Sequence, residues 1–182
     1  MKTLTLLRHA KSTWDDPVAR DFDRPLNRRG RKAARTVGRE MKAQGLAFDR
    51  ILASPAVRVM ETLGEVEDGY GAALTPAFDE TIYLASTETL LDLIRAVDDA
   101  AQSLLVVGHN PGLESLALLL TGAEDGDSKR AEIAVKYPTA TLAEIQLPID
   151  HWADIAPGTG RIARFIRPRD LDPELGPDED SY

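Results

Sequence analysis

Apolar segments of strand length alternate with segments of helical periodicity along most of the chain. Strands are predicted at residues 3–7, 48–53, 74–76, 103–107, 139–147 and 161–167. The segment 103–107 is the most apolar of these, which is typical of a strand in the centre of a sheet with both faces covered.

Helical periodicity fills the intervals between the predicted strands. Helices are expected from Asn27 to near Gly45, from Ser54 to about Val66, from Thr87 to Val97 and from Asn110 to Leu120. Asn27 is a favourable N-cap residue, and Ser54 and Asn110 each precede a proline, a pattern typical of a helix start. The regular alternation of strand and helix predicts an α/β fold, a three-layer α/β/α sandwich around a mostly parallel central sheet.

The chain shows no internal repeat and no break in composition, so we expect residues 1–169 to form a single domain. Residues 10–25 are polar and predict a long loop beside the end of the first strand. Residues 122–138 are charged and irregular, and we expect them to extend over the functional site of the protein. Residues 170–182 are rich in Pro, Asp and Glu, a composition that predicts an acidic, flexible tail.

Composition narrows the classes of function. The 182 residues carry a formal net charge of −8 and include no cysteine. The lack of cysteine excludes disulfides and thiolate catalysis, and the negative charge argues against general affinity for nucleic acid. The chain opens on a predicted strand rather than a leader, and its longest apolar stretch, 113–120, is too short to span a bilayer. We therefore expect a cytoplasmic protein without a membrane partner. We further expect it to be a monomer or a weak dimer.

Positive charge is concentrated near the N-terminus despite the acidic total. The segment contains Arg20, Arg24, Arg28, Arg29, Arg31, Lys32, Arg35 and Arg39. Most of these side chains fit the solvated face of a helix, and some are placed to attract an anionic substrate toward the end of the first strand.

Two of the three histidines stand where predicted strands end. His9 and His109 each follow an apolar strand segment directly. In open α/β sheets, ligands bind at the carboxyl ends of the strands. Arg8 lies beside His9, and Arg58 lies near the start of the helix that follows the second strand. Because guanidinium groups and helix N-termini both favour phosphate oxygens, these positions predict a site for a phosphoryl group.

Several separated elements, in this order along the chain, resemble the histidine phosphatase superfamily, also called phosphoglycerate-mutase-like. They are Arg8-His9 after the first strand, Leu26, Gly30 and Ala33-Ala34 in the first helix, Ser54-Pro55-Ala56-Val57-Arg58 after the second strand, and Val107-Gly108-His109-Asn110-Pro111 at the central strand. The run Arg8-His9-Ala10-Lys11-Ser12 further resembles the SixA-type phosphohistidine phosphatases of that superfamily. The resemblance spans about residues 1–167.

The resemblance implies a phosphoglycerate-mutase-like fold and a metal-independent phosphatase without a cofactor. His9 would be the nucleophile and form a phosphohistidine intermediate that water hydrolyses, since a neutral imidazole attacks phosphorus without prior deprotonation. We expect a backbone carbonyl of the same loop to orient its other nitrogen. Arg8, Arg58 and His109 would hold the phosphoryl oxygens of the phosphorylated substrate. The SixA-type resemblance favours phosphohistidine on a protein as that substrate.

An ester substrate would need a proton donor for its leaving group, and Glu80 is the candidate, with Asp79 as the second choice. The resemblance to the SixA-type group implies that no dedicated acid is needed, because a phosphoramidate leaves easily once its nitrogen is protonated. Lys11, Ser12 and Arg20 are candidates for further contacts to the bound phosphate or other oxyanion.

Two alternatives to a protein phosphohistidine phosphatase stay open at this point. One is a small-molecule phosphomonoesterase that acts on a sugar phosphate or similar ester with Glu80 as general acid. The other is a non-catalytic phosphate-binding module, which the intact set of Arg8, His9, Arg58 and His109 argues against. A metal site built on the two histidines lacks a third ligand at ordinary spacing, so no metal is expected.

Overall fold

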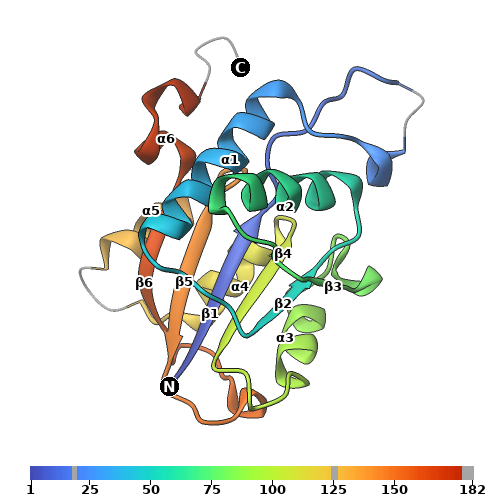
Figure 1. Cartoon of the computed structure of the whole chain (residues 1–182). Helices are drawn as coiled ribbons and strands as arrows, with labels where there is room; N and C mark the ends of the chain where they lie inside the picture. The colour runs from blue at the N-terminus through green and yellow to red at the C-terminus, as the bar shows by residue number, and fades with distance from the viewer. Residues whose placement is uncertain (18–19, 124–126, 178–182) are drawn as a thin grey trace.

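The computed structural model describes residues 1–17, 20–123 and 127–177 of the chain, and the centre of this part is a six-stranded sheet. The strands are β1 (Lys2–Arg8), β2 (Arg50–Ala53), β3 (Ala77–Phe78), β4 (Ser103–Gly108), β5 (Leu142–Leu147) and β6 (Arg161–Ile166). Their order across the sheet is β3-β2-β4-β1-β5-β6, and β5 runs antiparallel to both of its neighbours (Figure 1). The prediction of a mostly parallel sheet with residues 103–107 at its centre is confirmed.

Helices cover both faces of the sheet, as the three-layer prediction requires. They are α1 (Arg28–Ala43), α2 (Val57–Tyr70), α3 (Thr87–Arg95), α4 (Gly112–Leu120), α5 (Ser128–Val135) and α6 (Pro168–Leu171). Apolar residues of α1 and α2 pack on one face with Leu105 and Val107 of β4, and those of α3, α4 and α5 pack on the other with Leu104 and Val106 (Figure 1). Successive strand residues point to opposite faces, so β4 is apolar throughout because both of its faces are buried.

The start of α1 agrees with the sequence prediction, and it holds the loop after β1 in place. Asn27 caps the helix, since its side-chain oxygen accepts a hydrogen bond from the amide of Gly30 at 2.7 Å. The amide of Asn27 donates to the carbonyl of Lys11 at 3.0 Å. A Cβ atom at position 30 would lie 2.1 Å from that same Lys11 oxygen. Glycine therefore lets the loop that follows His9 lie directly on the helix.

Two other helices begin later than the sequence predicts. Helix α2 begins at Val57, so Ser54 is not its N-cap, and α4 begins at Gly112, one residue after the proline. The side chain of Asn110 nevertheless accepts a hydrogen bond from the amide of Glu114 at 3.3 Å. The later start of α2 leaves the hydroxyl of Ser54 available to the site.

Two further segments differ from the prediction. The short strand expected at 74–76 is found at Ala77–Phe78, where it pairs with β2. The irregular segment expected at 122–138 contains α5, which is capped by Asp127, while residues 124–126 lie outside the described part. Within the described ranges, no helix combines the length and the apolar composition that crossing a membrane requires.

The structure describes residues 170–177, the first part of the acidic segment that we expect to be flexible. Helix α6 and the turn after it pack on α1 (Figure 1). Lys32 of α1 lies 3.2 Å from the carboxylate of Asp172 and 2.9 Å from that of Glu174. Composition identified these acidic residues but not their pairing with the basic face of α1. Residues 178–182 lie outside the described part of the chain.

Candidate active site

Parallel strands that end at one edge of the sheet bring the two predicted histidines together. β1 pairs with β4 so that Arg8 lies opposite Gly108, and β4 in turn pairs in parallel with β2. The amide of His9 donates to the carbonyl of Gly108 at 3.0 Å, and the ring centroids of His9 and His109 are 5.3 Å apart. The site therefore forms at the carboxyl ends of the strands, where the sequence placed it.

The imidazole of His9 is oriented by its own loop. Its Nδ1 lies 2.7 Å from the carbonyl oxygen of Ala10, as the sequence analysis anticipates. Because a carbonyl oxygen only accepts, Nδ1 carries the proton and Nε2 keeps its lone pair. The amide of Ala10 donates to the hydroxyl of Thr62 at 2.9 Å, which ties this loop to α2. The ring is thus held in the tautomer that a nitrogen nucleophile requires.

Both imidazoles are buried and neutral near pH 7. His9 is 7% exposed and His109 is 4% exposed. Burial lowers the pKa of His9 to about 3, and the charges of Arg8 and Arg58 lower it further against the opposing hydrogen bond to Ala10. Burial, followed by the charge of Arg58, lowers the pKa of His109 to about 4. A neutral His9 has the lone pair that attack on phosphorus needs.

His109 is held between Ser54 and Arg58. Its Nε2 lies 2.8 Å from the hydroxyl of Ser54, and Nη2 of Arg58 donates to its Nδ1 at 3.3 Å. Nδ1 is therefore an acceptor in this state. A phosphoryl dianion beside His109 would favour the protonated ring, and the Nδ1 hydrogen would then be available to a phosphate oxygen.

Arg8 and Arg58 each present a buried donor that no described residue satisfies. Nη1 of Arg8 donates to the carbonyl of Tyr137 at 2.9 Å, and Nη1 of Arg58 donates to the carbonyl of Asp21 at 2.7 Å. The Nε atoms of both arginines are buried without a hydrogen-bond partner among the described residues. Unsatisfied buried donors are costly, and guanidinium groups match phosphate oxygens well. The two arginines are therefore suited to bind an oxyanion beside His9.

Asp21 is a site residue that the sequence analysis missed. Its carboxylate lies 3.0 Å from Nη2 of Arg58 and 3.0 Å from Nε of Arg24, and the hydroxyl of Tyr83 donates a short hydrogen bond to it. Burial raises its pKa, but the hydrogen bonds from Tyr83, Arg24 and Arg58 outweigh that effect and hold the pKa at about 2. A lone aspartate in a polar loop gives no sequence signal of this role.

Ser12 and Arg20, two of the candidate phosphate contacts, are engaged elsewhere. The hydroxyl of Ser12 accepts from Nη1 of Arg24 at 2.6 Å, which helps to shape the loop. Arg20 is exposed, and its Nε donates to the carboxylate of Asp23 at 2.8 Å. The structure therefore gives Ser12 a supporting position and does not bring Arg20 to His9.

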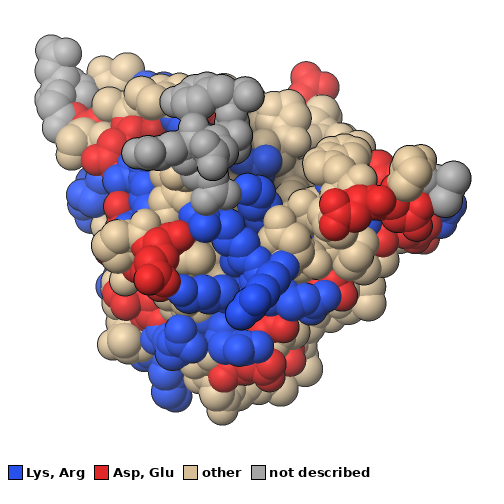
Figure 2. Space-filling model, turned by 90° about the horizontal axis from the view of Figure 1, so that it is seen from above, with Lys and Arg blue, Asp and Glu red and all other residues tan. Residues whose placement is uncertain are grey.

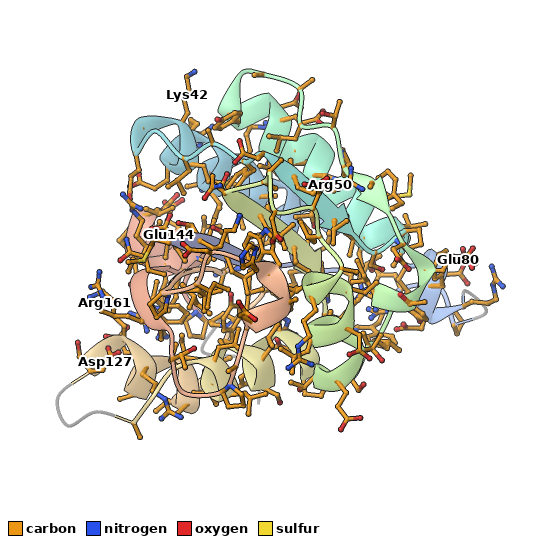
Figure 3. All side chains as sticks on the ribbon, turned by 90° about the horizontal axis from the view of Figure 1, so that it is seen from below. Lys42, Arg50, Glu80, Asp127, Glu144 and Arg161 are labelled. Carbon is orange, nitrogen blue, oxygen red and sulfur yellow. The ribbon has the colours of Figure 1, made fainter. Side chains whose placement is uncertain are left out.

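Lys11 and Glu80 also lie outside the immediate contacts of His9. Lys11 is exposed and lines a basic pocket that it shares with Arg8. Glu80 is exposed at the start of a 3-10 turn, and its side chain points away from the molecule (Figure 3). No ion pair or side-chain hydrogen bond joins Glu80 to any described residue. Its neighbour in the turn, Tyr83, is the residue that reaches the site, with its ring 5.3 Å from that of His109.

The described residues contain no group of three or more His, Cys, Asp or Glu side chains placed to share a metal ion. The third histidine, His151, is exposed and lies 3.0 Å from the carboxylate of Asp99, away from the site. The chemistry of the site therefore centres on imidazole and guanidinium groups.

Comparison with known proteins gives the family. The sequence pattern of the histidine phosphatase superfamily, branch 1, matches residues 4–84. An uncharacterized protein of Mycobacterium tuberculosis is 37% identical over 164 residues, which cover 90% of this chain and 100% of that protein. The match to a relative of this length shows that the similarity extends over nearly the whole chain.

Two solved structures have the same fold. A protein of Agrobacterium tumefaciens that carries the name of the phosphohistidine phosphatase SixA has a TM-score of 0.74 and 30% identity, with 91% of this chain and 97% of that chain covered. A SixA-named protein of Nakamurella multipartitia has a TM-score of 0.78 and 26% identity, with 92% and 96% covered. The predicted phosphoglycerate-mutase-like fold is confirmed. The chain therefore belongs to the histidine phosphatase superfamily, within which it is a phosphatase similar to the SixA group.

Proposed function

We propose that the chain is a metal-independent phosphatase that removes the phosphoryl group from phosphohistidine on a protein. The proposal depends on His9, whose Nδ1 donates to the carbonyl of Ala10, so that its Nε2 keeps the lone pair. In the first step, Nε2 of His9 forms a bond to phosphorus as the bond from phosphorus to the substrate imidazole breaks. The departing imidazole keeps a proton taken up from solvent. Water then attacks the phosphoryl group on His9 and releases phosphate.

The oxyanion site supplies electrostatic stabilisation for both steps. Arg8, Arg58 and His109 surround the position of the phosphoryl oxygens, and the two buried Nε donors are oriented before any ligand binds. Donors fixed in advance stabilise the charge that is spread over the transferred group without further rearrangement.

The observation that favours phosphohistidine over an ester concerns two described carboxylates, Asp21 and Glu80, neither of which is suited to donate a proton at His9. Asp21 is the described carboxylate that contacts the arginine at the site, and its pKa of about 2 keeps it ionised near neutral pH. Glu80 is exposed and has no contact with His9 or His109. An alkoxide leaving group needs a positioned acid, whereas the nitrogen of a phosphoramidate is basic enough to take its proton from water.

A turnover assay tests this function. The protein, freed of metal by a chelator, is given a phosphohistidine-bearing protein in parallel with a panel of phosphate esters, and Glu80→Gln is measured beside the wild type. We expect fast phosphohistidine cleavage that Glu80→Gln leaves unchanged. Strong ester hydrolysis that collapses in Glu80→Gln would contradict the proposal and make Glu80 the acid of a small-molecule phosphatase.

A further inference from the structure

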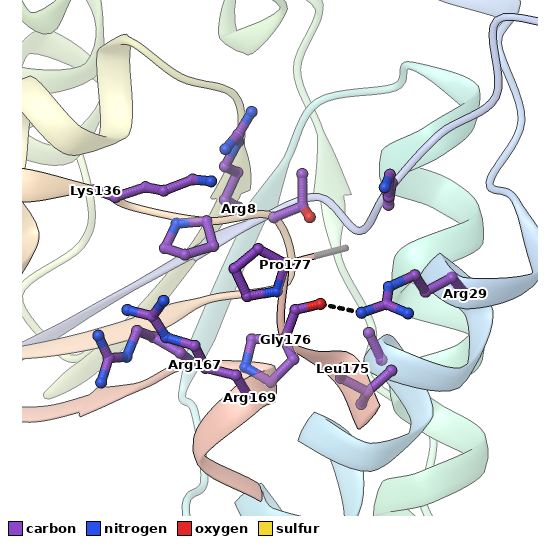
Figure 4. A pocket seen from close by; sticks show the side chains of 13 residues that line it. Arg8, Arg29, Lys136, Arg167, Arg169, Leu175, Gly176 and Pro177 are labelled. Atoms are coloured by element: carbon purple, nitrogen blue, oxygen red, sulfur yellow. Dashed lines mark hydrogen bonds between the residues drawn. The ribbon is translucent and has the colours of Figure 1, made fainter. Parts of the chain in front are cut away.

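A basic pocket of about 330 Å³ is lined in part by Arg8, and neither His9 nor His109 is among its lining residues. Its walls come from four segments: the end of β1 with the loop after it, the start of α1, the loop before β5 and the segment that follows β6. The cationic side chains that line it are Arg8, Lys11, Arg29, Lys136, Arg167 and Arg169, and no described Asp or Glu lines it (Figure 4). Figure 2 shows that Lys and Arg side chains form a continuous band across the same end of the molecule.

The cationic side chains that line this pocket differ in their ion pairs. Arg167 pairs with Asp170 at 2.9 Å and with Glu132 at 3.6 Å, which lie outside the lining. Lys136 and Arg169 form no ion pair with a described carboxylate, and the side chain of Lys136 extends toward Arg8 (Figure 4). Like charges that converge in this way repel one another unless an anion joins them.

A second basic surface provides a contrast. On the exposed face of α1, Arg31 and Arg35 pair with Glu65 of α2 at 3.6 Å and 2.6 Å, and Lys32 pairs with Glu174 at 2.9 Å. These three cations of the α1 face have carboxylate partners among the described residues. In the pocket beside Arg8, Lys136 and Arg169 have none.

We propose that this pocket binds a phosphate group of a small polyanion, next to the phosphoryl group that His9 accepts and with Arg8 shared between the two. Arg8 lines the pocket, and its buried Nε has no hydrogen-bond partner among the described residues. Guanidinium forks hold phosphate oxygens in pairs. Walls from four segments and a volume near the lower limit of small-molecule sites fit a compact anion better than an extended acidic peptide. The inference does not depend on phosphohistidine being the substrate.

Calorimetry with inorganic pyrophosphate as the probe tests the pocket directly. The double variant Lys136→Ala/Arg169→Ala is compared with Lys42→Ala/Arg161→Ala, which removes the same charge from positions outside the pocket (Figure 3). We expect the dissociation constant of pyrophosphate to rise about tenfold in the first variant and to stay within about twofold in the second. Circular dichroism reports whether the variants fold, and the single change Lys136→Gln replaces the double variant where it does not.

Pyrophosphate that binds only around His9 would be insensitive to Lys136 and Arg169, and that result would overturn the proposal. So would binding of a poly-glutamate peptide, with the same sensitivity, to a protein that ignores pyrophosphate. All binding measurements are repeated in the His9→Ala variant. Binding to the pocket can then be measured even if the proposed role of His9 in catalysis is wrong.

Kinetics with the same variants distinguish two sources of the bound phosphate. A KM that rises about tenfold in Lys136→Ala/Arg169→Ala for a bisphosphorylated compound, but not for its monophosphorylated form, assigns the phosphate to the substrate itself. An unchanged KM for both, with weaker inhibition by pyrophosphate, assigns it to a separate small molecule. Either result supports the pocket as a phosphate site.

Discussion

Asp21 holds Arg58 through two of its nitrogens, although the residues are far apart in the sequence. Nη1 of Arg58 donates to the backbone oxygen of Asp21 at 2.7 Å, and Nη2 donates to its carboxylate at 3.0 Å. Arg58 is 2% exposed, so its guanidinium depends on these bonds for both solvation and direction. The short segment around Asp21 is therefore part of the site, through a residue that need not touch substrate.

Asp21→Asn tests this positioning role. The amide keeps the size of the side chain but removes the charge that holds Arg58, and hydrogen bonds to charged groups are worth about 1.5–3 kcal/mol. We expect kcat/KM to fall about tenfold to hundredfold, mainly because Arg58 loses its fixed orientation. Asp23→Asn, in the same loop but paired with the exposed Arg20, is the control and should stay within about twofold. Equal losses of kcat/KM in the two variants would contradict a positioning role that is specific to Asp21.

Arg58→Lys should be nearly as damaging as removal of the side chain. Lysine keeps the positive charge but lacks the Nε donor and the planar fork, and loss of one preorganised donor costs about 10²–10³ in turnover in comparable oxyanion sites. Steady-state kinetics of Arg58→Lys and Arg20→Ala provide the measurement. Arg20→Ala is the control, because the structure places this candidate phosphate contact at the surface. Near-normal kcat in the Arg58→Lys variant would show that charge alone suffices.

The buried histidines should make the protein less stable in mild acid. Their pKa values of about 3 for His9 and about 4 for His109 lie below the ordinary value of 6.5, so between these limits the unfolded chain binds protons that the folded chain does not. The free energy of unfolding then decreases as pH falls from about 6.5, by about 1.4 kcal/mol per pH unit for each histidine.

Urea unfolding at pH 7, 6 and 5 checks this slope. His9→Gln and His109→Gln should each make it shallower. His151→Gln should not, because that exposed histidine has its pKa raised by the hydrogen bond to Asp99. A wild-type slope that neither buried variant alters would contradict the burial argument.

A pair of glycines in helices tests how the loop after His9 is positioned. Gly30→Ala would place a Cβ atom 2.1 Å from the Lys11 carbonyl, so the loop must move. We expect a destabilisation of about 1–3 kcal/mol and a loss of turnover. In α2, a Cβ at Gly64 meets nothing within 4 Å, and Gly64→Ala should stabilise the protein by about 0.5–1 kcal/mol. Thermal unfolding and turnover of both variants provide the comparison.

Much of the site could be predicted from the sequence because its key residues directly follow strands. His9 and His109 end apolar runs, and the parallel register of β1 and β4 then brings them together. Asp21 could not be found in this way, since its contacts with Arg58 and Tyr83 depend on how a polar loop folds back. The basic pocket also escaped prediction, because its cations, Lys136 and Arg169 among them, come from segments that are far apart in the sequence.

The order of helices and strands could also be predicted from the sequence. The residues at which they begin and end were harder to predict. Apolar periodicity locates β4 and the helices on either face, whereas the start of α2 is set by tertiary contacts. Ser54, a good N-cap on local grounds, instead lies 2.8 Å from His109. The pairing of Lys32 with Asp172 and Glu174 likewise depends on tertiary contacts that composition alone does not predict.

The most direct measurement is to trap the phosphorylated enzyme during turnover. A labelled phosphohistidine-bearing protein is mixed with the chain, quenched in base within milliseconds, and the phosphorylated position is identified by mass spectrometry. We expect label on Nε2 of His9 that appears and decays at the rate of turnover, and none in His9→Ala. Release of phosphate at the full rate without label on His9 would show that water attacks the substrate directly, and the account of His9 as nucleophile would be wrong.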